Sequence, residues 1–432
     1  MSPPAPHLVD EIIEEIFLRL PTPAALARVS TACPRFRRII TERSFLRRYR
    51  KRHPPPLLGF VDDAGGFHPA QAPYPSAPLA RALADAADFT CSFVPKPSEG
   101  LWYACDVRDG RVLLVEISLS SNGIAVCDPL SRRYVLLPPT PGDLTSENKR
   151  PRQSKPLLVP VSEDEDETLF KVIRFADYGT ELAVFVFSSI TEKWSVAAST
   201  SWSSSTSWSS LGGRPPWLDS HPFGCRGLSC FVGGCFYLAS PCGDKLLVLE
   251  LDTLFSTVNN HTGHHVKLRW LPRRVENDLA RNNRQCRPRP GQARLPRIVV
   301  GKEGAIEVFS LLDDNSPNGL FYLYHSTQQN NGESSKECQL ENIVPLPGGY
   351  NYFTVGADEG FLFLGATTED QLDISRGSGV ELLTTYWDVD YFSLDVKTSE
   401  LMKVCRRKRC FFTRENVYWY FGFPPSLSKP SI

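Results

Sequence analysis

The segment that decides the fold of most of this chain is Ala-Val-Cys-Asp-Pro-Leu-Ser-Arg-Arg-Tyr-Val-Leu-Leu-Pro at residues 125–138. It consists of a short apolar run, a polar turn and a second apolar run with an aromatic residue soon after the turn. This pattern predicts two strands joined by a short turn. Similar segments start near residues 184, 247 and 391, at intervals of 59, 63 and 144 residues, and the last interval has room for two units.

Repetition at this interval is typical of a propeller with four-stranded blades, since kelch-like units repeat at about 50 residues. Short apolar runs bounded by turn residues continue from about Cys91 onward, and long helical patterns do not alternate with them, which argues against an α/β fold. The alternative is an ordinary β-sandwich with similar hairpins. We therefore predict a β-propeller-like, kelch-like domain over residues 91–425. The runs are 111–115, 123–127, 182–187, 235–238, 246–249, 298–300 and 361–364.

The first fifty residues have a different, helical pattern. Apolar residues recur at every fourth position, which predicts an amphipathic helix. These residues are Leu8, Ile12, Ile16 and Leu20. Pro21 ends this helix, Thr22-Pro23 can begin a second, and a third can begin at Pro34. A few short helices cannot bury all of their apolar surface. Part of it is therefore expected to contact a partner.

Proline-rich sequence follows this head and predicts a semi-rigid linker over residues 54–90. The alternative is that the apolar residues of the head dock on the C-terminal domain. A semi-rigid spacer between the two parts argues against such docking.

The head resembles an F-box over about 45 residues. The matching motifs are Leu-x-Asp-Glu at 8–11, Arg-Leu-Pro at 19–21, Val-Ser-x-x-Cys at 29–33, Arg-x-Ile within 36–40 and Ser-Phe-Leu at 44–46. Val9 stands where the family usually has proline and Phe36 where it usually has tryptophan, and both remain apolar. The resemblance implies a three-helix module, here residues 1–53, that binds a Skp-type adaptor within a cullin–RING ubiquitin ligase.

The resemblance also implies which residues contact the adaptor. They are Leu8, Val9, Ile12, Ile16, Leu20, Pro21, Leu26 and Val29. Some of them must belong to the core of the module, and the sequence does not separate the two sets. Residues 128–139 resemble the first repeat of the F-box-associated domain that is common in plant F-box proteins.

Composition and charge narrow the class of protein. The 432 residues carry 48 Lys and Arg against 48 Asp and Glu, a net charge of zero, which excludes a globally basic nucleic-acid binder. No apolar stretch approaches the roughly 20 residues that span a bilayer, and no secretory signal is visible. The 12 cysteines are therefore expected to be reduced thiols of a soluble protein of the cytoplasm or nucleus. Lys403 with Arg406–Arg409 is either a nuclear localisation patch or an ordinary surface strand.

Other patterns do not predict a metal, a cofactor or nucleic-acid binding. His221, Cys225, Cys230, Cys235 and Cys242 lack the Cys-x2-Cys spacing of a zinc site. Residues 267–302 have a net charge of +9, which indicates either a solvated loop or a surface for an anion or acidic partner. Only Trp270 is available there for base stacking, so nucleic acid is not the expected partner.

No short catalytic motif appears in the chain. The F-box resemblance implies a non-catalytic substrate receptor of an SCF-type (Skp–cullin–F-box) ubiquitin ligase, whose β domain recruits an unknown target protein. Two alternatives remain at this point: a propeller-fold enzyme acting on sugars, and a Skp-binding adaptor that does not lead to degradation.

Overall fold

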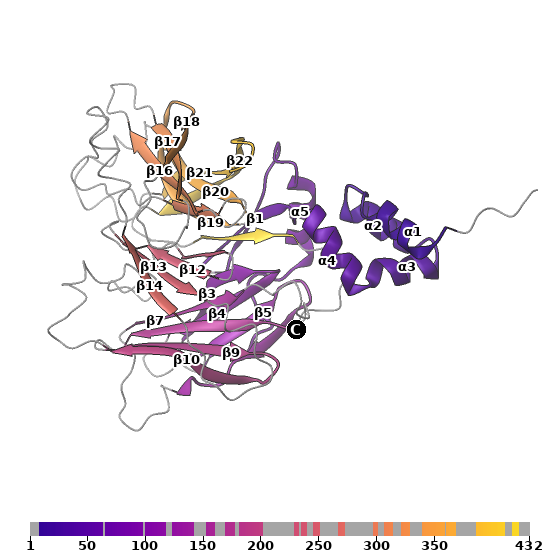
Figure 1. The fold of residues 1–432 in the computed structure, drawn as a ribbon, viewed down its shortest axis with the longest axis horizontal. Coiled ribbons are helices and arrows are strands. Elements are labelled where there is room, and N and C mark those ends of the chain that lie inside the picture. The colour runs from indigo at the N-terminus through magenta and orange to yellow at the C-terminus, as the bar shows by residue number, and fades with distance from the viewer. Residues whose placement is uncertain are drawn as a thin grey trace, which may run out of the picture.

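The computed structural model describes the chain in separate stretches. The described residues are 8–63, 65–97, 100–117, 123–141, 153–159, 169–177, 181–201, 229–232, 235–239, 245–250, 267–272, 297–300, 306–313, 321–328, 339–358, 360–368, 386–410 and 417–422. Within them a small helical head stands to one side of a larger body of β-sheets (Figure 1).

The head contains four helices, not the three that the sequence predicts. They are α1 (Asp10–Phe17), α2 (Pro23–Ser30), α3 (Pro34–Thr41) and α4 (Arg43–Arg52). The Thr22 hydroxyl accepts a hydrogen bond from the backbone N–H of Ala25 and caps α2. The fourth helix, α4, has ten residues. It forms a full helix because Phe45, Leu46 and Tyr49 share one face that is buried in the head.

The body consists mainly of four-stranded antiparallel sheets whose strands follow each other in chain order. The first sheet is β3 (Leu101–Arg108), β4 (Arg111–Ile117), β5 (Ile124–Asp128) and β6 (Arg133–Leu136). The second is β7 (Gln153–Val159), β8 (Lys171–Asp177), β9 (Glu181–Ser188) and β10 (Lys193–Ser201). The third is β11 (Ser229–Val232), β12 (Cys235–Ala239), β13 (Lys245–Glu250) and β14 (Lys267–Pro272).

Two further sheets of this kind follow, and each sheet is open at both edges. The fourth is β15 (Arg297–Val300), β16 (Ile306–Asp313), β17 (Phe321–Gln328) and β18 (Gln339–Pro345). The fifth is β19 (Tyr350–Asp358), β20 (Phe361–Thr368), β21 (Tyr386–Asp395) and β22 (Leu401–Cys410). All seven apolar runs that were predicted to be strands lie in strands, which confirms a mostly β body.

The sequence repeat corresponds to the third strand of a sheet and the turn that follows it. Its four starts lie in β5, β9, β13 and β21, and the long interval before the last start contains one further sheet, β15–β18. In the first and fifth sheets an aspartate stabilises the turn: the Asp128 carboxylate accepts hydrogen bonds from the backbone N–H groups of Leu130 and Ser131 at 3.0 and 3.1 Å. Asp395 makes the same contacts two and three residues ahead.

These turns also share a residue in the left-handed backbone conformation just before the fourth strand or close to it. The residues are Arg132, Glu192 and Ser399, with φ of 55°, 54° and 57°. The repeat is therefore a conserved backbone shape within the chain, in which side-chain oxygens hold the turn and one residue with positive φ redirects the strand.

The predicted Pro-rich linker over residues 54–90 is wrong for most of its length. β1 (Leu57–Asp62) pairs with β23 (Val417–Phe421) and with β2 (Phe67–Pro69), so residues from both ends of the chain share one three-stranded sheet. α5 (Ala77–Ala86) packs Ala80 and Leu83 into the same core. The reason is that the apolar run at 57–61 is fully buried, which outweighs the prolines around it. Four residues separate α4 from β1: His53 and the three prolines at 54–56.

A glycine makes the close approach of β1 and β2 possible. Gly59 has a φ of 144°, and a Cβ atom there would lie 2.2 Å from the carbonyl oxygen of His68 on β2. Only glycine is compatible with both the backbone conformation and this contact.

The largest core cluster lies where the β2-β1-β23 sheet, α5 and the first and fifth sheets meet. Phe60, Val112 and Phe363 come from three different sheets and are each fully buried in it. A second cluster joins the first and second sheets, and a third joins the fourth and fifth. Of the helices in the described segments, none is long and apolar enough to cross a membrane.

Candidate functional site

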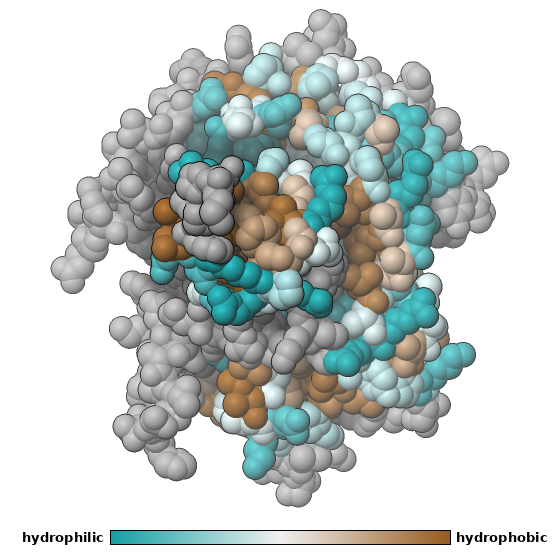
Figure 2. All heavy atoms as spheres, turned by 90° about the vertical axis from the view of Figure 1, so that its right-hand side faces the viewer, coloured by the Kyte–Doolittle hydropathy of each residue, from teal (hydrophilic) through white to brown (hydrophobic). Residues whose placement is uncertain are grey.

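The outward side of α1 carries an apolar surface that the head does not cover. Ile13 and Phe17 point into the head and are 5% and 6% exposed. Four other side chains on or just before α1 remain 47–54% exposed. They are Leu8, Val9, Ile12 and Ile16, which we call the outer apolar face. Figure 2 views the molecule from the side of the head and shows apolar patches bordered by hydrophilic ones.

Ion pairs to α3 hold the start of α1 in place. Arg35 donates from Nε to Asp10 Oδ1 at 2.7 Å and from Nη2 to the carbonyl oxygen of Leu8 at 2.7 Å. Arg38 donates to the other Asp10 oxygen at 2.7 Å. The hydrogen bond from Arg35 is the main cause that lowers the pKa of Asp10, with the positive charges of both arginines adding to it. These contacts fix the first residues of the outer apolar face.

The middle of α1 is tied to α4 in the same way. Arg48 donates from Nη1 to Glu14 at 2.7 Å and also pairs with Glu15. Tyr49 donates its hydroxyl to the carbonyl oxygen of Leu20 at 3.1 Å, just beyond the end of α1. The helix is thus held by charges on its flanks and by Ile13 and Phe17 beneath, so its apolar outer side is rigidly presented.

The predicted adaptor-contact residues fall into three groups. Leu8, Val9, Ile12, Ile16 and Pro21 are exposed, and Leu20 and Val29 are half-buried against the core of the head.

Leu26 does not belong with the exposed residues: it is 0% exposed and lies in the core of the head. An adaptor could contact Leu26 only if the head opened, so its assignment to the contact surface is corrected here. Pattern alone did not separate it from the others because α2 has apolar residues on more than one side.

The two departures from the F-box pattern, Phe36 in place of tryptophan and Val9 in place of proline, both fit the structure of the head. Phe36 stacks edge-on against Phe17 at a centroid distance of 5.0 Å, which joins α3 to α1. Val9 adopts φ −71° and ψ 155°, and its carbonyl accepts the first hydrogen bonds of α1. A proline at this position would have a similar φ.

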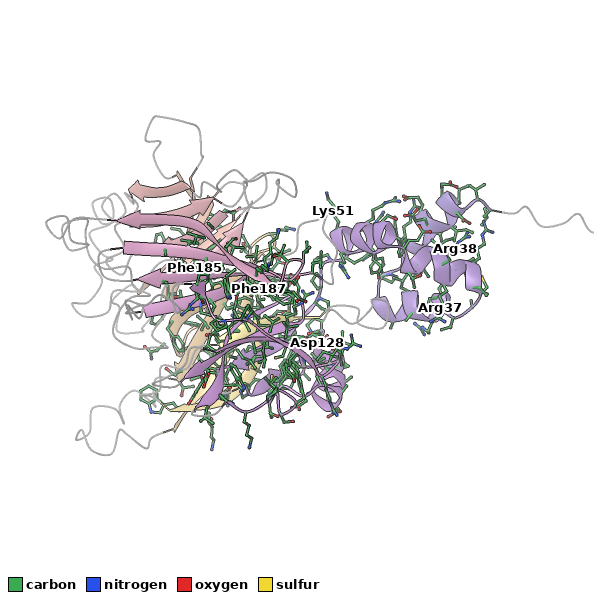
Figure 3. All side chains as sticks on the ribbon, turned by 90° about the horizontal axis from the view of Figure 1, so that it is seen from below. Arg37, Arg38, Lys51, Asp128, Phe185 and Phe187 are labelled. Atoms are coloured by element: carbon green, nitrogen blue, oxygen red, sulfur yellow. The ribbon has the colours of Figure 1, made fainter. Side chains whose placement is uncertain are left out.

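The arginines that position α1 were not among the residues predicted from the sequence. Arg35 and Arg38 are three residues apart and therefore lie on one face of α3. That spacing, together with the acidic Asp10 at the start of α1, could have predicted the ion pairs between the two helices. Figure 3 shows Arg37 and Arg38 on the outer part of the head, and Lys51 at the side of the head toward the β body.

The basic run on β22 is engaged in ion pairs with buried acids. Asp390 is 2% exposed and accepts hydrogen bonds from Arg406 at 2.6 and 2.9 Å and an ion pair from Lys403 at 2.8 Å. Burial raises the pKa of Asp390, but hydrogen bonds from Arg406 and Lys403 outweigh it and hold the pKa below its usual value. Nuclear localisation through this run stays a prediction.

A second buried acid connects β1, β2 and β22. Asp62 accepts a hydrogen bond from the backbone N–H of Gly66 at 2.8 Å, lies 2.9 Å from His68 Nε2 and pairs with Arg407 at 2.8 Å. Burial tends to raise its pKa, whereas His68, Gly66 and Arg407 together lower it below the usual value. Both buried acids are thus occupied by protein partners.

The remaining candidate patterns lie largely outside the described residues. Cys230 and Cys235 are on β11 and β12, while His221, Cys225 and Cys242 are not described. Of the basic stretch 267–302, only the strand segments 267–272 and 297–300 are described. In the segments that the structure does describe, no group of three or more His, Cys, Asp or Glu residues is arranged to hold a metal ion.

Comparison with known families places an F-box domain at residues 6–48. This range covers α1 to α3 and the first half of α4. F-box domains bind Skp-type adaptors within cullin-based complexes, and proteins that carry them are generally non-catalytic subunits of such ligases. No curated protein matches the chain as a whole.

Similarity to solved structures is weak. A post-proline cleaving enzyme from Rickettsia typhi is 10% identical at a TM-score of 0.29, with 73% of this chain and 37% of that chain covered. An α-L-arabinofuranosidase from Clostridium thermocellum is 11% identical at a TM-score of 0.28, with 70% and 92% covered. The Nup133 β-propeller domain of Vanderwaltozyma polyspora is 8% identical at 0.27, with 74% and 91% covered.

The chain spans about a third of the length of the first two structures that it matches, the second being oligopeptidase B from Trypanosoma brucei.

Proposed function

We propose that this chain is a substrate receptor of an SCF-type ubiquitin ligase, in which the helical head binds a Skp-type adaptor and the β body recruits a target protein. The F-box match at residues 6–48 supports the first half of this proposal. The single structural observation that carries it is the outer apolar face, a set of half-exposed side chains on a helix that two sets of ion pairs hold in place.

The chemistry of ubiquitin transfer would then belong to other subunits. A receptor raises the effective concentration of its target near the ubiquitin donor, which needs no catalytic side chain. The short connection at residues 53–56 favours this role, because its three prolines limit the relative motion of the head and the β body.

The proposal includes a propeller-like arrangement of the β body. Support comes from sheets that pack in chain order and from contacts between the first strands of successive sheets, β3 with β7, β11 with β15 and β15 with β19. The sheet that combines β1 with β23 shares a core with the first and the fifth sheets, as expected if it lies between them. The proposal also includes a relationship of the β body to the plant F-box-associated domain and to kelch blades. It further includes a location of the protein in the cytoplasm or nucleus.

Co-purification with a Skp-type adaptor tests the proposal. The full chain should capture the adaptor, and the double variant Ile12→Asp/Ile16→Asp should not, because two carboxylates would be desolvated at the contact. Ile190→Asp is the matched control, since Ile190 is also an exposed isoleucine, at 59%, but lies in the β body. Equal capture by wild type and double variant would contradict the assigned face, and no capture by any of the three would contradict the proposal.

Two other functions remain as alternatives with distinct outcomes. A Skp-binding adaptor outside degradation would capture the adaptor and a partner but leave the level of that partner unchanged when the chain is depleted. A propeller enzyme acting on sugars needs open carboxylates, whereas the two buried aspartates described here, Asp62 and Asp390, are each paired with basic side chains. A turnover screen of the full chain on sugar substrates distinguishes this alternative.

A further inference from the structure

We infer that β6, the outer edge strand of the first four-stranded sheet, binds an extended peptide segment of a partner protein as an added strand. This inference deepens the proposed function and rests on it in one respect: the partner would be a target that the β body recruits. The site is defined by Tyr134 and Leu136, whose backbone and side chains are both accessible.

The hydrogen-bonding pattern shows that the backbone groups of these two residues are directed to the edge of the sheet on which no described strand pairs with β6. Among the strands that the structure describes, β6 is the last of its sheet and pairs only with β5. Leu137 donates its N–H to the carbonyl oxygen of Ile124 at 2.9 Å, which identifies a hydrogen-bonded pair. Because such pairs alternate along antiparallel strands, Leu136 and Tyr134 occupy the positions between them. Their N–H and C=O groups therefore point away from β5.

The same two residues expose apolar side chains. Tyr134 is 39% and Leu136 is 48% exposed, although the residues opposite them on β5, Cys127 and Ala125, are fully buried. Being two positions apart, the two side chains stand on one face of the sheet at a spacing of about 6.8 Å. Val135 between them points to the opposite face, where it packs against the core between the first two sheets.

Three other outer edge strands have bulges that discourage pairing, whereas β6 has none. The outer strand β14 is regular like β6, but it carries Lys267 and Arg269 and ends at Pro272. β10 has a bulge between Val196 and Ala198, and β18 has a shift of register opposite His325 and Ser326. β22 has both a bulge and a series of basic side chains. Bulges and charges of this kind protect edges against added strands. β6 pairs with β5 in regular register over its whole length, and after one basic residue, Arg133, it carries the exposed Tyr134 and Leu136.

The edge is also held rigid. Asp128 fixes the turn before β6 through its hydrogen bonds to the backbone, as described above. The backbone N–H of Asp88 donates to the carbonyl oxygen of Pro129 at 2.9 Å and ties this turn to the segment after α5. A strand that is already fixed loses little conformational entropy when a peptide binds.

The size of the edge indicates which kind of partner fits. Two residues offer at most four backbone hydrogen bonds and a small apolar area, far below the roughly 1,000 Å² that a stable protein dimer buries. A short extended peptide with apolar residues at alternate positions meets these requirements, since strand addition takes its affinity from main-chain hydrogen bonds and its specificity from alternate side chains. A second copy of this chain does not.

The test is direct peptide binding to the full chain, measured by fluorescence anisotropy. The probe is a labelled heptapeptide, Thr-Val-Thr-Ile-Thr-Val-Thr, and its counterpart methylated on alternate backbone nitrogens. We expect binding of the unmodified peptide in the range below 1 mM, at least tenfold weaker binding by Tyr134→Lys/Leu136→Lys, and no binding of the methylated peptide. Ile190→Lys serves as the matched surface control and should bind as wild type does.

Three results would overturn the inference: no binding by wild type up to 1 mM, equal binding by the double variant, or equal binding of the methylated peptide. Light scattering on the same samples would overturn it too, if it showed a dimer that the double variant abolishes, because the occupant would then be a second copy. Adaptor capture by the same proteins reports separately on the proposed function, since Tyr134 and Leu136 lie outside the head.

Discussion

Shortening Ile12 and Ile16 to alanine should weaken adaptor binding without unfolding the head. Each side chain is 48% exposed in the free chain, so an adaptor can remove about half of its surface from water. Burying a whole isoleucine side chain is worth about 1.5–3 kcal/mol, and half of this is about 1 kcal/mol per residue. Each variant should therefore raise the Kd about fivefold, and the double variant about 30-fold.

Isothermal titration calorimetry of the purified chain with a Skp-type adaptor measures this change, and thermal unfolding of the same samples checks the fold. Ile190→Ala is the matched control, with an exposed isoleucine on the β body, and its Kd should equal that of wild type. Ile13→Ala, whose side chain is buried, should instead destabilise the head by about 2–5 kcal/mol. An increase of less than threefold in the Kd of the double variant, with adaptor binding intact, would refute the assignment of the outer apolar face.

Three predictions concern stability. Leu26→Ala should destabilise the head by about 2–5 kcal/mol, measured by urea unfolding, because Leu26 is fully buried in its core; a loss of affinity with unchanged stability would return Leu26 to the adaptor surface. Asp62→Asn should cost about 3 kcal/mol at pH 7, since Arg407 would lose its anionic partner, whereas exposed Asp85→Asn should change stability by less than about 0.5 kcal/mol. Because the folded pKa of Asp62 is lowered, its contribution is complete above the unfolded pKa of about 3.9 and is lost as pH falls through the folded value. If the stability of Asp62→Asn depended on pH below 4 as strongly as that of the wild type, this would contradict the prediction. Gly59→Ala should disrupt β1 and β2, lowering the melting temperature, because its Cβ would clash with the His68 carbonyl; an unchanged melting temperature would count against the described backbone.

Much of the fold was predictable where the determining interactions are local. The apolar period of residues 8–20 predicted α1, and the turn at 128–132 predicted the hairpin of β5 and β6 because an aspartate side chain stabilises its own turn. The repeat of this hairpin indicated similar sheets along the chain, which the third strands of four sheets confirm. The prediction of a linker over residues 54–90 was wrong because the apolar run at 57–61 is buried as a strand despite the prolines around it.

The sequence predicted that the head has an apolar surface, but not which apolar residues belong to the outer apolar face. Eight apolar residues matched the F-box pattern, and only burial in the folded head separates the exposed Ile12 from the buried Leu26. Apolar residues look alike in sequence whether they face a core or a partner, because both environments remove them from water. The position of β6 at the edge of its sheet likewise depends on the order of the described strands and not on residues 133–136 themselves.

By itself the sequence determined the helical head, the mostly β body and the turn chemistry, since these depend on residues a few positions apart. The pairing of β1 with β23 across most of the chain depends on the tertiary structure, as do the ion pairs of Asp390 with Lys403 and Arg406 and of Asp62 with Arg407. The physical reason is that such contacts are selected by the burial of whole sheets against each other. Local sequence carries the propensity to form a strand, and which distant strand it meets depends on the packing of all of them.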